Sequence, residues 1–392
     1  MSVVLITGST GLVGSEAVNF FCKKGFDVIG IDNNLRKFFF GKDGSTLWVK
    51  NKLIKSNKKF KNYSVDIRNF NNLKKIFKKY SRNISLIIHC AAQPSHDYGK
   101  NYPVIDFNVN ATGTLNLLEL TKNYCPEAPF IFMSTNKVYG DNPNKLKIEE
   151  KKTRWELNKK DKFFRGINEQ FSIDECTHSF FGVSKTYADL IVQEYGKNVG
   201  LKTVSFRGGC ITGPNHSGAK LHGFLSYLVK LSLTKKKYSL IGYKGKQVRD
   251  NLHSEDLVNC FWEFYKKPRR GEVYNMGGGR FSNCSIIEAI DYIENHDEYV
   301  SAQGRYVTFW FNDKSSIDYL PRYEVFRNYE IKHRVAKERM KLSMSPYMHQ
   351  FYAVHKTDIL KEALSVCTKH YQPRGWELNV SLVASMYGNH KL

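Results

Sequence analysis

The chain has 392 residues, and its 60 Lys and Arg outnumber its 37 Asp and Glu, which gives a formal net charge of +23 at pH 7. Hydrophobic residues make up 41% and aromatic residues 14% of the chain, so it has enough apolar surface for a folded core, and disorder throughout is excluded. No uncharged apolar run reaches the roughly 18–20 residues that span a bilayer, and no charged segment precedes an apolar stretch at the amino end. The sequence therefore predicts a cytoplasmic protein with no membrane partner.

The eight cysteines are scattered along the chain, with no C-x-x-C pair and no clustering with histidines at the spacing of a zinc site. A chain of this size in a reducing compartment does not need a disulfide framework. We therefore expect buried free thiols and no metal site.

Positive charge is concentrated between Arg36 and Arg82, where fifteen Lys and Arg accompany only two acids, Asp43 and Asp66. Such a stretch can mark a nucleic-acid-binding surface. Most of these residues are lysines, however, and the sequence lacks the arginine and aromatic motifs of known nucleic-acid-binding modules. An anionic small substrate explains the charge more simply, so no nucleic-acid partner is expected.

The first predicted strand, at residues 2–7, leads into three glycines with the spacing G-x-x-G-x-x-G, which are Gly8, Gly11 and Gly14. A helical pattern then runs to Gly25. Gly8 allows a sharp turn off the strand, Gly11 lets the backbone approach a pyrophosphate, and Gly14 permits close packing of the helix on the strand. The helix N-terminus offers free N–H groups and the positive end of its dipole to the phosphates. This pattern predicts a dinucleotide-binding site.

A second predicted strand, at residues 26–31, ends in Asp32, eighteen residues after Gly14. An acid at the tip of this strand can accept hydrogen bonds from both hydroxyls of the adenosine ribose. Because a carboxylate repels a 2′-phosphate, Asp32 favours NAD over NADP. The strand, glycines, helix, second strand and acid follow the order and spacing of a dinucleotide-binding unit, so NAD is the expected cofactor.

Strand and helix patterns continue to alternate along the chain. Further strands are predicted at 62–68, 83–92 and 130–133, and an amphipathic helix with apolar residues at i, i+3 and i+4 opens at Asn110. This alternation is typical of an α/β fold with a doubly wound parallel sheet (Rossmann), in which ligands bind at the carboxyl ends of the strands.

Two of these strand ends offer further contacts to a cofactor. Asp66 and Ile67 are placed where they could border the adenine ring. The small side chains of Ala91 and Ala92 would let the loop after their strand pack against the cofactor. A tight strand end is the alternative explanation for the two alanines.

The order of several motifs resembles that of the extended short-chain dehydrogenase/reductases, the family of nucleotide-sugar epimerases and dehydratases. The matching segments are Gly8–Gly14, His89–Gln93, Asn110–Thr114, Ser134–Tyr139, Phe181–Lys185, Phe206–Pro214 and Gly245–Asp256. The resemblance covers residues 1 to about 288. It implies an NAD-binding and sugar-nucleotide-binding domain over 1–288, built from a Rossmann sheet and a smaller substrate lobe.

Within the family, the segment around Thr135, the neighbourhood of Arg154 and residues 246–250 resemble the CDP-paratose 2-epimerases, also called tyvelose epimerases. The resemblance implies an isomerase that transiently oxidises a sugar carbon of a nucleotide-diphosphate sugar, with a CDP-sugar favoured, in surface polysaccharide synthesis. A nucleotide-sugar 4-epimerase or 4,6-dehydratase is the alternative within the family. A dehydratase needs an acid/base pair beside Thr135, and Asn136 and Lys137 occupy that place, which counts against it.

The resemblance also implies roles for individual residues. Those implied for the cofactor are Gly8, Gly11, Leu12, Val13, Gly14, Asp32, Asn33, Asp66, Ile67, Ala91, Ala92, Asn110 and Lys185. Those implied for the substrate are Gln93, Thr135, Asn136, His216, Lys246, Arg249 and His253. Arg249 is the expected diphosphate ligand, because a guanidinium can bind phosphate oxygens in a bidentate manner. Thr135 and Lys185 are implied catalytic residues.

The sequence departs from the family at the position that carries the proton. In the family a tyrosine removes the hydroxyl proton, and a lysine four residues later on the same helix lowers the pKa of that phenol. Lys185 is present, but Phe181 stands where the tyrosine belongs, and phenylalanine has no titratable proton. His178 is the expected catalytic substitute, because it lies three residues before Phe181 and imidazole titrates near neutral pH. Further candidates are Cys176 and Thr177 near the same helix start, Tyr139 on the opposing loop, and Cys210, which is predicted to lie in a loop.

Phe181 also raises an alternative from another functional class, a catalytically inactive subunit that binds NAD and a nucleotide sugar. Residues 215–224 form a polar, glycine-rich segment with two histidines, where the family folds its substrate lid. A decayed enzyme would lose such positions, so the sequence favours an active enzyme.

The match to the family ends after Glu288. Residues 289–392 hold fourteen Lys and Arg and twelve acids, a net charge of +2 against +21 for residues 1–288. Stretches at 298–311 and 349–360 resemble part of a bacterial glycosyltransferase-associated domain, so we expect an appended, non-catalytic C-terminal α+β segment. A divergent substrate lobe is the alternative. A homodimer is the assembly that we consider for the chain.

Overall fold

The computed structural model describes residues 2–219, 222–234, 236–240 and 242–295, together with short strands at 301–302, 308–311, 317–320 and 354–355. Most of residues 289–392 lie outside this set, and so does most of the two stretches that resemble a glycosyltransferase-associated domain. The boundary after residue 288 and the assignment of the tail therefore stay predictions.

Contacts within the chain divide it into two compact units. The first comprises Met1–Tyr227, Lys246–Ser285 and Phe309–Asp318, and the second comprises Leu228–Gly245, Ile286–Thr308 and Tyr319–Leu392. All the site residues predicted from the sequence belong to the first unit.

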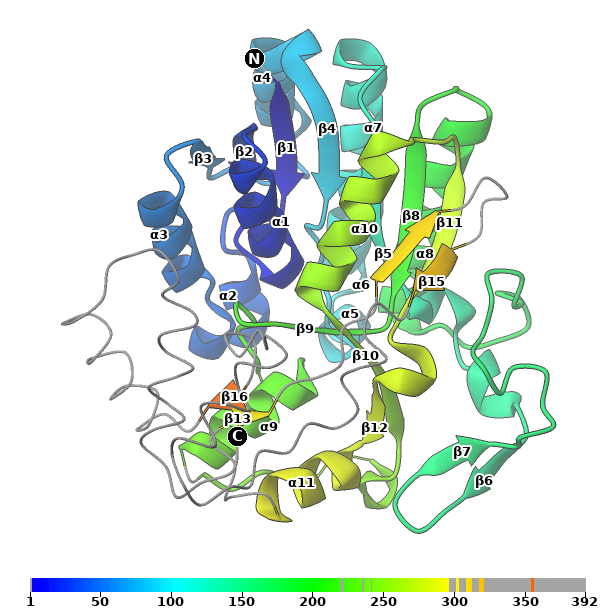
Figure 1. Cartoon of the computed structure of the whole chain (residues 1–392). Coiled ribbons are helices and arrows are strands. Elements are labelled where there is room, and N and C mark those ends of the chain that lie inside the picture. Colours follow the sequence, from blue (N-terminus) through cyan, green and yellow to red (C-terminus); the bar gives the residue numbers. More distant parts are fainter. Residues whose placement is uncertain are drawn as a thin grey trace. The chain divides into compact units, whose positions relative to one another are not determined.

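A seven-stranded parallel sheet forms the centre of the first unit, in the order β11–β8–β5–β4–β1–β2–β3 (Figure 1). Its strands are β1 (Val3–Thr7), β2 (Asp27–Ile31), β3 (Phe60–Tyr63), β4 (Ile84–His89), β5 (Phe130–Thr135), β8 (Thr203–Gly208) and β11 (Glu272–Met276). Each neighbouring pair is parallel. The strand order reverses between β1 and β4, and ligands of such sheets bind at the carboxyl ends of the strands at this point.

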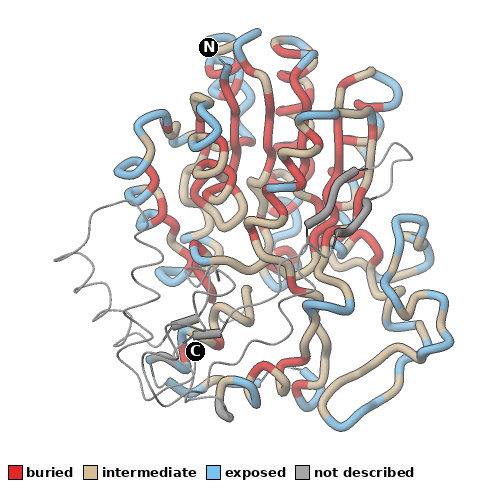
Figure 2. Tube along the Cα trace, in the orientation of Figure 1, coloured by how far each residue is buried: buried red, intermediate tan, exposed pale blue. Residues whose placement is uncertain are grey.

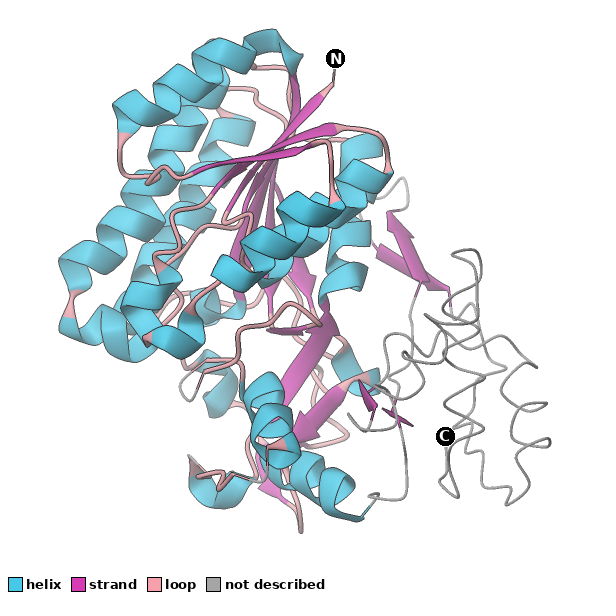
Figure 3. Ribbon diagram, turned by 90° about the vertical axis from the view of Figure 1, so that its left-hand side faces the viewer, coloured by secondary structure: helices cyan, strands magenta, loops and turns pink. Residues whose placement is uncertain are grey.

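Helices cover both faces of the sheet (Figure 3). One face carries α4 (Phe70–Tyr80), α7 (Gly113–Tyr124) and α8 (Ser179–Lys197), and the other carries α1 (Leu12–Lys23), α3 (Leu47–Ser56) and α10 (Ser254–Lys266). Successive residues of a strand point to opposite faces, so Val3 and Leu5 of β1 pack with the first group while Val4 and Ile6 pack with the second. The central strands are accordingly buried over most of their length (Figure 2).

The other described elements are shorter helices, turns and small sheets, which belong to both units. The helical ones are α2 (Arg36–Phe40), α5 (His96–Asn101), α6 (Pro103–Phe107), α9 (Phe224–Leu233), α11 (Ile286–Asn295), a π-helical turn η3 (Asn108–Thr112) and the 3₁₀ turns η1 (Lys42–Gly44), η2 (Ser81–Asn83), η4 (Asn136–Tyr139), η5 (Asn142–Lys145), η6 (Tyr243–Gly245) and η7 (Gly279–Phe281). A three-stranded sheet has the order β12 (Asn283–Ser285), β10 (Val248–His253) and β9 (Cys210–Thr212). Two-stranded pairs are β6 (Ile148–Glu150) with β7 (Trp155–Leu157), β13 (Ser301–Ala302) with β16 (Val354–His355), and β14 (Thr308–Phe311) with β15 (Ile317–Leu320).

The predicted α/β fold with a doubly wound parallel sheet is confirmed, with two local corrections. The third strand is Phe60–Tyr63 rather than residues 62–68, because the chain turns where the Asp66 carboxylate accepts the backbone N–H of Arg68 at 2.9 Å. Cys210 lies in β9 and not in a loop. Within the described residues, no helix is both long and apolar enough to cross a bilayer.

Candidate functional site

The turn after β1 depends on contacts that larger residues would prevent. Gly8 has φ +65°, in the left-handed region that favours glycine, and its N–H donates to the Ile31 carbonyl at 2.9 Å. A Cβ at Gly14 would lie 2.1 Å from the Gly8 carbonyl oxygen. Helix α1 can therefore approach the turn this closely only with glycine at position 14.

The N-terminus of α1 lies directly after this turn. The helix begins at Leu12 with Gly11 as its N-cap, and no side chain caps it. The N–H groups of the first turn have no acceptor within the helix, and they carry the positive end of the helix dipole. Leu12, Val13 and Gly14 line a crevice at this point. Such a helix end fits the pyrophosphate of a dinucleotide.

Asp32 follows β2 and lines the same crevice. Its Oδ2 accepts the backbone N–H of Thr10 at 3.0 Å, and its Oδ1 accepts that of Asn34 at 2.8 Å. These two bonds link the carboxylate to the glycine turn on one side and to the chain after β2 on the other. The fixed carboxylate is suited to accept the hydroxyls of a ribose.

Asp66 and Ile67 lie beside Asp32 in the lining of the crevice. Asp66 Oδ2 accepts Asn33 Nδ2 at 3.2 Å and pairs with Arg68 Nη2 at 2.7 Å. Burial raises the pKa of Asp66, but the hydrogen bonds and charge of Arg68 outweigh it, so the pKa lies below its ordinary value. The carboxylate is therefore ionised at neutral pH.

The crevice brings together residues from many parts of the sequence. Of the predicted site residues, those that line it are Gly8, Gly11, Leu12, Val13, Gly14, Asp32, Asn33, Asp66, Ile67, Ala91, Ala92, Thr135, Lys185 and His216. It runs along the carboxyl ends of β1, β2, β4, β5 and β8, where a doubly wound sheet binds its ligands.

Asn110 and Gln93 are buried and do not line the crevice. Asn110 Oδ1 accepts the Gln93 N–H at 2.9 Å, and Asn110 Nδ2 donates to Ser184 Oγ at 3.0 Å. Gln93 Nε2 donates to Asp106 Oδ1 at 2.5 Å. These two side chains connect the loop after β4 to α6 and α8, so they position the walls of the crevice.

Two of the predicted substrate ligands are engaged elsewhere. Lys246 Nζ pairs with Glu150 Oε1 at 2.6 Å, which links the chain just before β10 to the β6–β7 hairpin. His253 is the N-cap of α10, where its Nδ1 accepts the Glu255 N–H at 3.2 Å. Neither side chain lines the crevice.

Arg249, Asn136 and His178 also lie outside the lining of the crevice. Arg249 and Asn136 are exposed. His178 is the residue before α8, and its Nε2 lies 2.9 Å from the Val138 carbonyl oxygen. The structure therefore uses His178 to join the start of α8 to η4 and does not bring it to the crevice.

Lys185 lies on α8 and is 4% exposed. We call the part of the crevice lined by Thr135, Phe181 and Lys185 its substrate end, and the part lined by the glycine turn and Asp32 its cofactor end. Its Nζ donates to the Met133 carbonyl at 2.8 Å and stands 4.1 Å from the centre of the Phe132 ring. Burial lowers the pKa of Lys185 to about 8, although Asp189, Cys90 and Asp106 act in the opposite direction. The amine is thus held at the end of β5, where burial has a larger effect on its pKa than the nearby acidic groups.

Thr135 and Phe181 complete this end of the crevice. Thr135 is the last residue of β5, and its Oγ1 accepts the Lys137 N–H at 3.2 Å. Phe181 is 7% exposed and faces the crevice from the first turn of α8. An apolar ring therefore lines the same crevice as Thr135 and Lys185.

A buried ion pair lies behind Thr135. Arg207 bonds Asp189 in a bidentate manner, with Nη2 2.8 Å from Oδ1 and Nε 3.1 Å from Oδ2. Ser134 Oγ donates to Asp189 Oδ2 at 2.5 Å. Tyr139 OH donates to Asn275 Oδ1 at 2.8 Å and accepts Arg207 Nη1 at 2.9 Å, and burial raises its pKa. The Tyr139 phenol is therefore part of this support and is not free for a substrate.

Arg36 and His222 line the crevice but were missed by the sequence analysis. Arg36 Nη2 donates to the Ser217 carbonyl at 2.9 Å and lies 3.2 Å from His222 Nδ1, and burial lowers the pKa of Arg36 to about 10. These contacts attach α2 to Ser217 and His222. In the sequence, Arg36 was noted only as a member of the basic cluster that begins at that position. Nothing in that cluster distinguished it from the solvated lysines.

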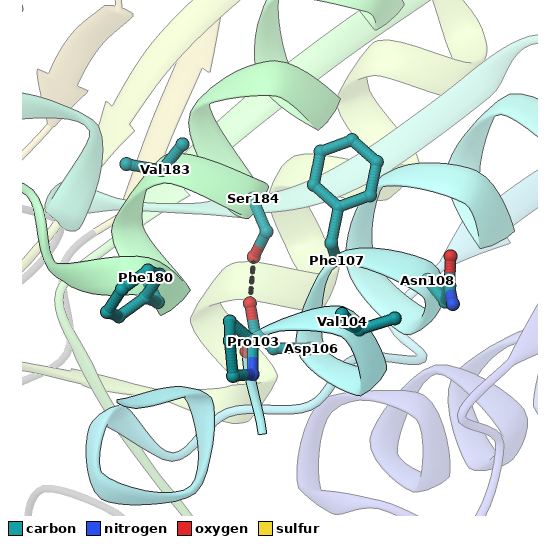
Figure 4. Close-up of a pocket in the computed structure, with 8 residues that line it drawn as sticks. All are labelled: Pro103, Val104, Asp106, Phe107, Asn108, Phe180, Val183 and Ser184. Carbon is teal, nitrogen blue, oxygen red and sulfur yellow. Dashed lines mark hydrogen bonds between the residues drawn. The ribbon is translucent and has the colours of Figure 1, made fainter. Parts of the chain in front are cut away.

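A second, apolar hollow of about 300 Å³ lies between α6 and α8 (Figure 4). It is lined by Pro103, Val104, Asp106, Phe107, Asn108, Phe180, Val183 and Ser184. Ser184 Oγ donates to Asp106 Oδ2 at 2.5 Å at its base. With one buried hydrogen-bonded pair and many exposed apolar side chains, the hollow lacks the polar groups of a site for a nucleotide.

Comparison with known proteins agrees with this geometry. Residues 4–277 match the NAD dependent epimerase/dehydratase family. The chain is 32% identical over 299 residues to the CDP-paratose 2-epimerase of Salmonella typhi, covering 75% of this chain and 84% of that protein. It is 29% identical over 298 residues to the UDP-glucuronate 4-epimerase of Thermodesulfobacterium geofontis, covering 75% of this chain and 80% of that protein.

A solved structure is also similar. It is the UDP-glucuronic acid 4-epimerase of Bacillus cereus with a tyrosine replaced by phenylalanine, in complex with UDP-4-deoxy-4-fluoro-glucuronic acid and NAD. The TM-score is 0.58 at 26% identity, covering 75% of this chain and 82% of that one. The family match over most of the sequence and the relative at 32% identity show that the chain belongs to the NAD dependent epimerase/dehydratase family.

Proposed function

We propose that the chain is a nucleotide-sugar epimerase of the CDP-paratose 2-epimerase type, acting on a CDP-sugar in surface polysaccharide synthesis. Its family makes it an NAD-dependent enzyme of the epimerase/dehydratase kind, and its 32% identical relative is a CDP-paratose 2-epimerase. A cytoplasmic location is part of the proposal, because the seven cysteines in the described part of the chain are free thiols, which persist in reducing compartments.

The residues at the cofactor end fit NAD. Bound NAD⁺ would accept a hydride from a sugar carbon and return it to the opposite face. The uncapped N-terminus of α1 would hold the pyrophosphate, and Asp32 would accept the adenosine ribose hydroxyls. Asp66 and Ile67 would border the adenine, and Ala91 and Ala92 leave room for the cofactor over the end of β4.

One observation carries the proposal: Thr135 and Lys185 line the same crevice as the glycine turn. The Lys185 ammonium would donate to the nicotinamide ribose, and the Thr135 hydroxyl would orient the sugar hydroxyl that is oxidised. Because Lys185 is buried against the end of β5, its position is fixed before any ligand binds.

Arg249 is the proposed ligand of the diphosphate. Burial is the main cause that lowers the pKa of Lys137, and the positive charge of Arg249 lowers it further. The two cations are therefore neighbours beside the end of β5. Cations that repel each other in this way would both gain from an anionic ligand. Because Lys246 and His253 are engaged in other contacts, we propose no direct role for them, whereas His216 remains a proposed contact.

The proposal is tested by incubating the NAD-loaded protein with CDP-, UDP- and GDP-sugars in deuterated water and following the products by NMR. Formation of an epimer without net accumulation of NADH is the expected result, with the CDP-sugar converted fastest. Thr135→Ala and Lys185→Met should each lower conversion at least 100-fold. Conversion that survives both changes would refute the site.

A 4,6-dehydratase is disfavoured by the charges that line the crevice. Elimination of water needs an acid/base pair beside the oxidised carbon. Of the described residues in the lining, the acids are Asp32 and Asp66, and both lie at the cofactor end. The sugar panel distinguishes the reactions, because a dehydratase product lacks one oxygen.

The alternative from another class is a subunit that binds NAD and a nucleotide sugar without turnover. It is favoured by one observation, the apolar ring of Phe181 in the crevice that Thr135 and Lys185 also line. Tight binding of CDP-sugars by calorimetry, with no product from any sugar in the panel, would support this alternative.

A homodimer is also part of the proposal. Val104 is 71% exposed and Phe180 and Val183 are each 54% exposed around the hollow between α6 and α8, and a second copy of the chain would bury them. Val183→Glu should shift the sedimentation of the protein from dimer to monomer. Ile54→Glu, on exposed α3, is the control and should leave it unchanged.

A further inference from the structure

His96, the first residue of α5, lies beside Phe181. The centroids of the two rings are 4.9 Å apart, and the rings meet edge to face. Pro94, two residues earlier, lines the crevice, as Phe181 does. The imidazole therefore stands next to the apolar ring at the substrate end.

One nitrogen of the His96 ring is fixed by α8. Nδ1 lies 2.9 Å from Ser179 Oγ, which also accepts the N–H of Gly182 at 3.2 Å. No described residue hydrogen-bonds Nε2 of His96, and the side chain is exposed. A base that a hydroxyl orients through one nitrogen keeps the other nitrogen available for a substrate.

Three titratable groups are near enough to interact electrostatically with His96. They are Lys137 of η4, Asp97, which follows His96 on α5, and His222 of the segment after β9. Partial burial and then the charge of Lys137 lower the pKa of His96 below its ordinary value, while Asp97 acts in the opposite direction. The imidazole is therefore neutral at pH 7 and able to accept a proton.

The other candidates are less well placed. Nε2 of His178 is committed to the Val138 carbonyl, and the Tyr139 phenol is bonded to Asn275 and Arg207. Burial raises the pKa of Cys210 above its ordinary value, so it is a poor source of thiolate. His96 does not line the crevice itself, but its ring contacts Phe181, which does, and its Nε2 has no hydrogen-bond partner among the described residues.

We propose that His96 accepts and returns the proton of the substrate hydroxyl, the task that a tyrosine performs elsewhere in the family. The inference rests on the proposed epimerase function. During oxidation of the sugar Nε2 would take the O–H proton as the C=O bond forms, and NAD⁺, when bound, would supply the acceptor for the hydride that leaves the carbon. On return of the hydride to carbon the imidazolium would give its proton back to that oxygen, so no net oxidation would remain.

The first test is the turnover of His96→Gln on whichever sugar of the panel the wild type converts. We expect kcat to fall at least 100-fold, with the Kd of NAD and the melting temperature unchanged. Lys100→Gln, at an exposed position of the same helix, is the matched control. If the wild type converts no sugar, the proposed function fails and the inference fails with it; if His96→Gln keeps half of the wild-type kcat, the inference alone fails. A larger loss from His178→Gln than from His96→Gln would also overturn it.

A rescue experiment separates a proton carrier from a structural residue. Adding Phe181→Tyr to His96→Gln places a phenol four residues before Lys185. We expect the double variant to recover at least tenfold in kcat, and the acidic limb of its pH profile to move upward, because a phenol replaces an imidazole. A double variant no faster than His96→Gln would overturn the assignment.

A third readout needs no turnover. Nitrogen-15 NMR of the histidine rings in the full chain, with His96 assigned through His96→Gln, reports which ring nitrogen carries the proton. We expect the Nδ1–H tautomer donating to Ser179 Oγ and a pKa below 6.5 that rises in Lys137→Met. The opposite tautomer, with Nε2 protonated, would overturn the proposal, because that nitrogen could not accept the hydroxyl proton.

Discussion

The cofactor end and the substrate end of the crevice are assembled from the chain in different ways. The cofactor end is built mainly from the first 67 residues, where glycine turn, helix and Asp32 are consecutive parts of one β–α–β unit, and the loop after β4 adds Ala91 and Ala92. The substrate end draws on the end of β5 and on α8, which are far apart in the sequence. Backbone geometry defines the first end, whereas buried side-chain contacts such as Arg207 with Asp189 define the second.

The two ends of the crevice therefore differ in which substitutions they tolerate. A glycine turn admits few alternatives, since almost any added atom meets backbone. At the substrate end, a proton carrier can come from any segment that reaches the crevice, so loss of a phenol at Phe181 can be offset by His96. The comparison can be tested by changing one feature of each end.

The largest effect is expected where the substrate end is supported. Asp189→Ala leaves the buried guanidinium of Arg207 without its carboxylate, and removal of one partner of a buried pair costs about 3–5 kcal/mol in the free energy of unfolding. Asp66→Ala, at the more exposed pair with Arg68, should cost about 1 kcal/mol or less. Urea denaturation measures both. Equal losses would contradict the contrast between the two ends.

At the cofactor end, Gly14→Ala is the corresponding change. The new Cβ would lie 2.1 Å from the Gly8 carbonyl oxygen, so α1 must shift, at a cost of about 3 kcal/mol. We expect calorimetry to show at least a 100-fold weaker Kd for NAD. Gly11→Ala, whose Cβ would meet Gly8 oxygen only at 3.3 Å, should weaken NAD binding while sparing stability. If Gly14→Ala binds NAD as wild type does, the close packing of turn and helix is not required.

Lys185→Met should separate stability from function. Burial lowers the pKa of Lys185 from 10.5 to about 8, so the charged form is disfavoured in the folded chain. Because the pKa of Lys185 is lower in the folded chain, its contribution to the free energy of unfolding is fully present above pH 10.5. That contribution is lost as the pH falls through 8. At pH 7 the methionine variant should therefore have a free energy of unfolding about 2 kcal/mol higher than that of the wild type. It should still lose turnover. Urea denaturation at pH 7 and at pH 10 checks this, since the gain should shrink at the higher pH.

The smallest effect is expected at Asp250, in β10. Burial raises its pKa to about 6, against the backbone N–H groups of Gly278 and Gly279, which both donate to its Oδ1. Because the pKa of Asp250 is higher in the folded chain, its contribution to the free energy of unfolding is fully present below pH 3.8. That contribution is lost as the pH rises through 6. Asp250→Asn keeps an Oδ1 acceptor without the charge, so it should gain about 1 kcal/mol at pH 8 and nothing at pH 3.5. Thermal melts at the two pH values measure the difference, and a gain independent of pH would contradict it.

The fold and the cofactor end could be predicted from the sequence because their signals are local. Gly8, Gly11, Gly14 and Asp32 are separated by short spacings that backbone geometry fixes, and the alternation of strands and helices identifies a parallel sheet. All four residues line the crevice. The end of the third strand was misplaced because its turn is set by the Asp66 side chain, which periodicity does not reveal.

The substrate end was harder to predict because its residues carry no local pattern. Thr135, Lys185 and His216 came from resemblance to a family, and they do line the crevice. Lys246 and His253 were expected there as well, but an ion pair and a helix cap engage them.

The sequence by itself determined the class of this protein: a doubly wound sheet with a dinucleotide site, because turns, helix starts and strand ends are encoded within a few residues of each other. Only the tertiary structure decided which titratable groups meet at the far end of the crevice. Side chains such as His96 and Phe181 are brought together by packing of α5 against α8 across more than eighty positions, and such long-range contacts leave no periodic signature in the chain.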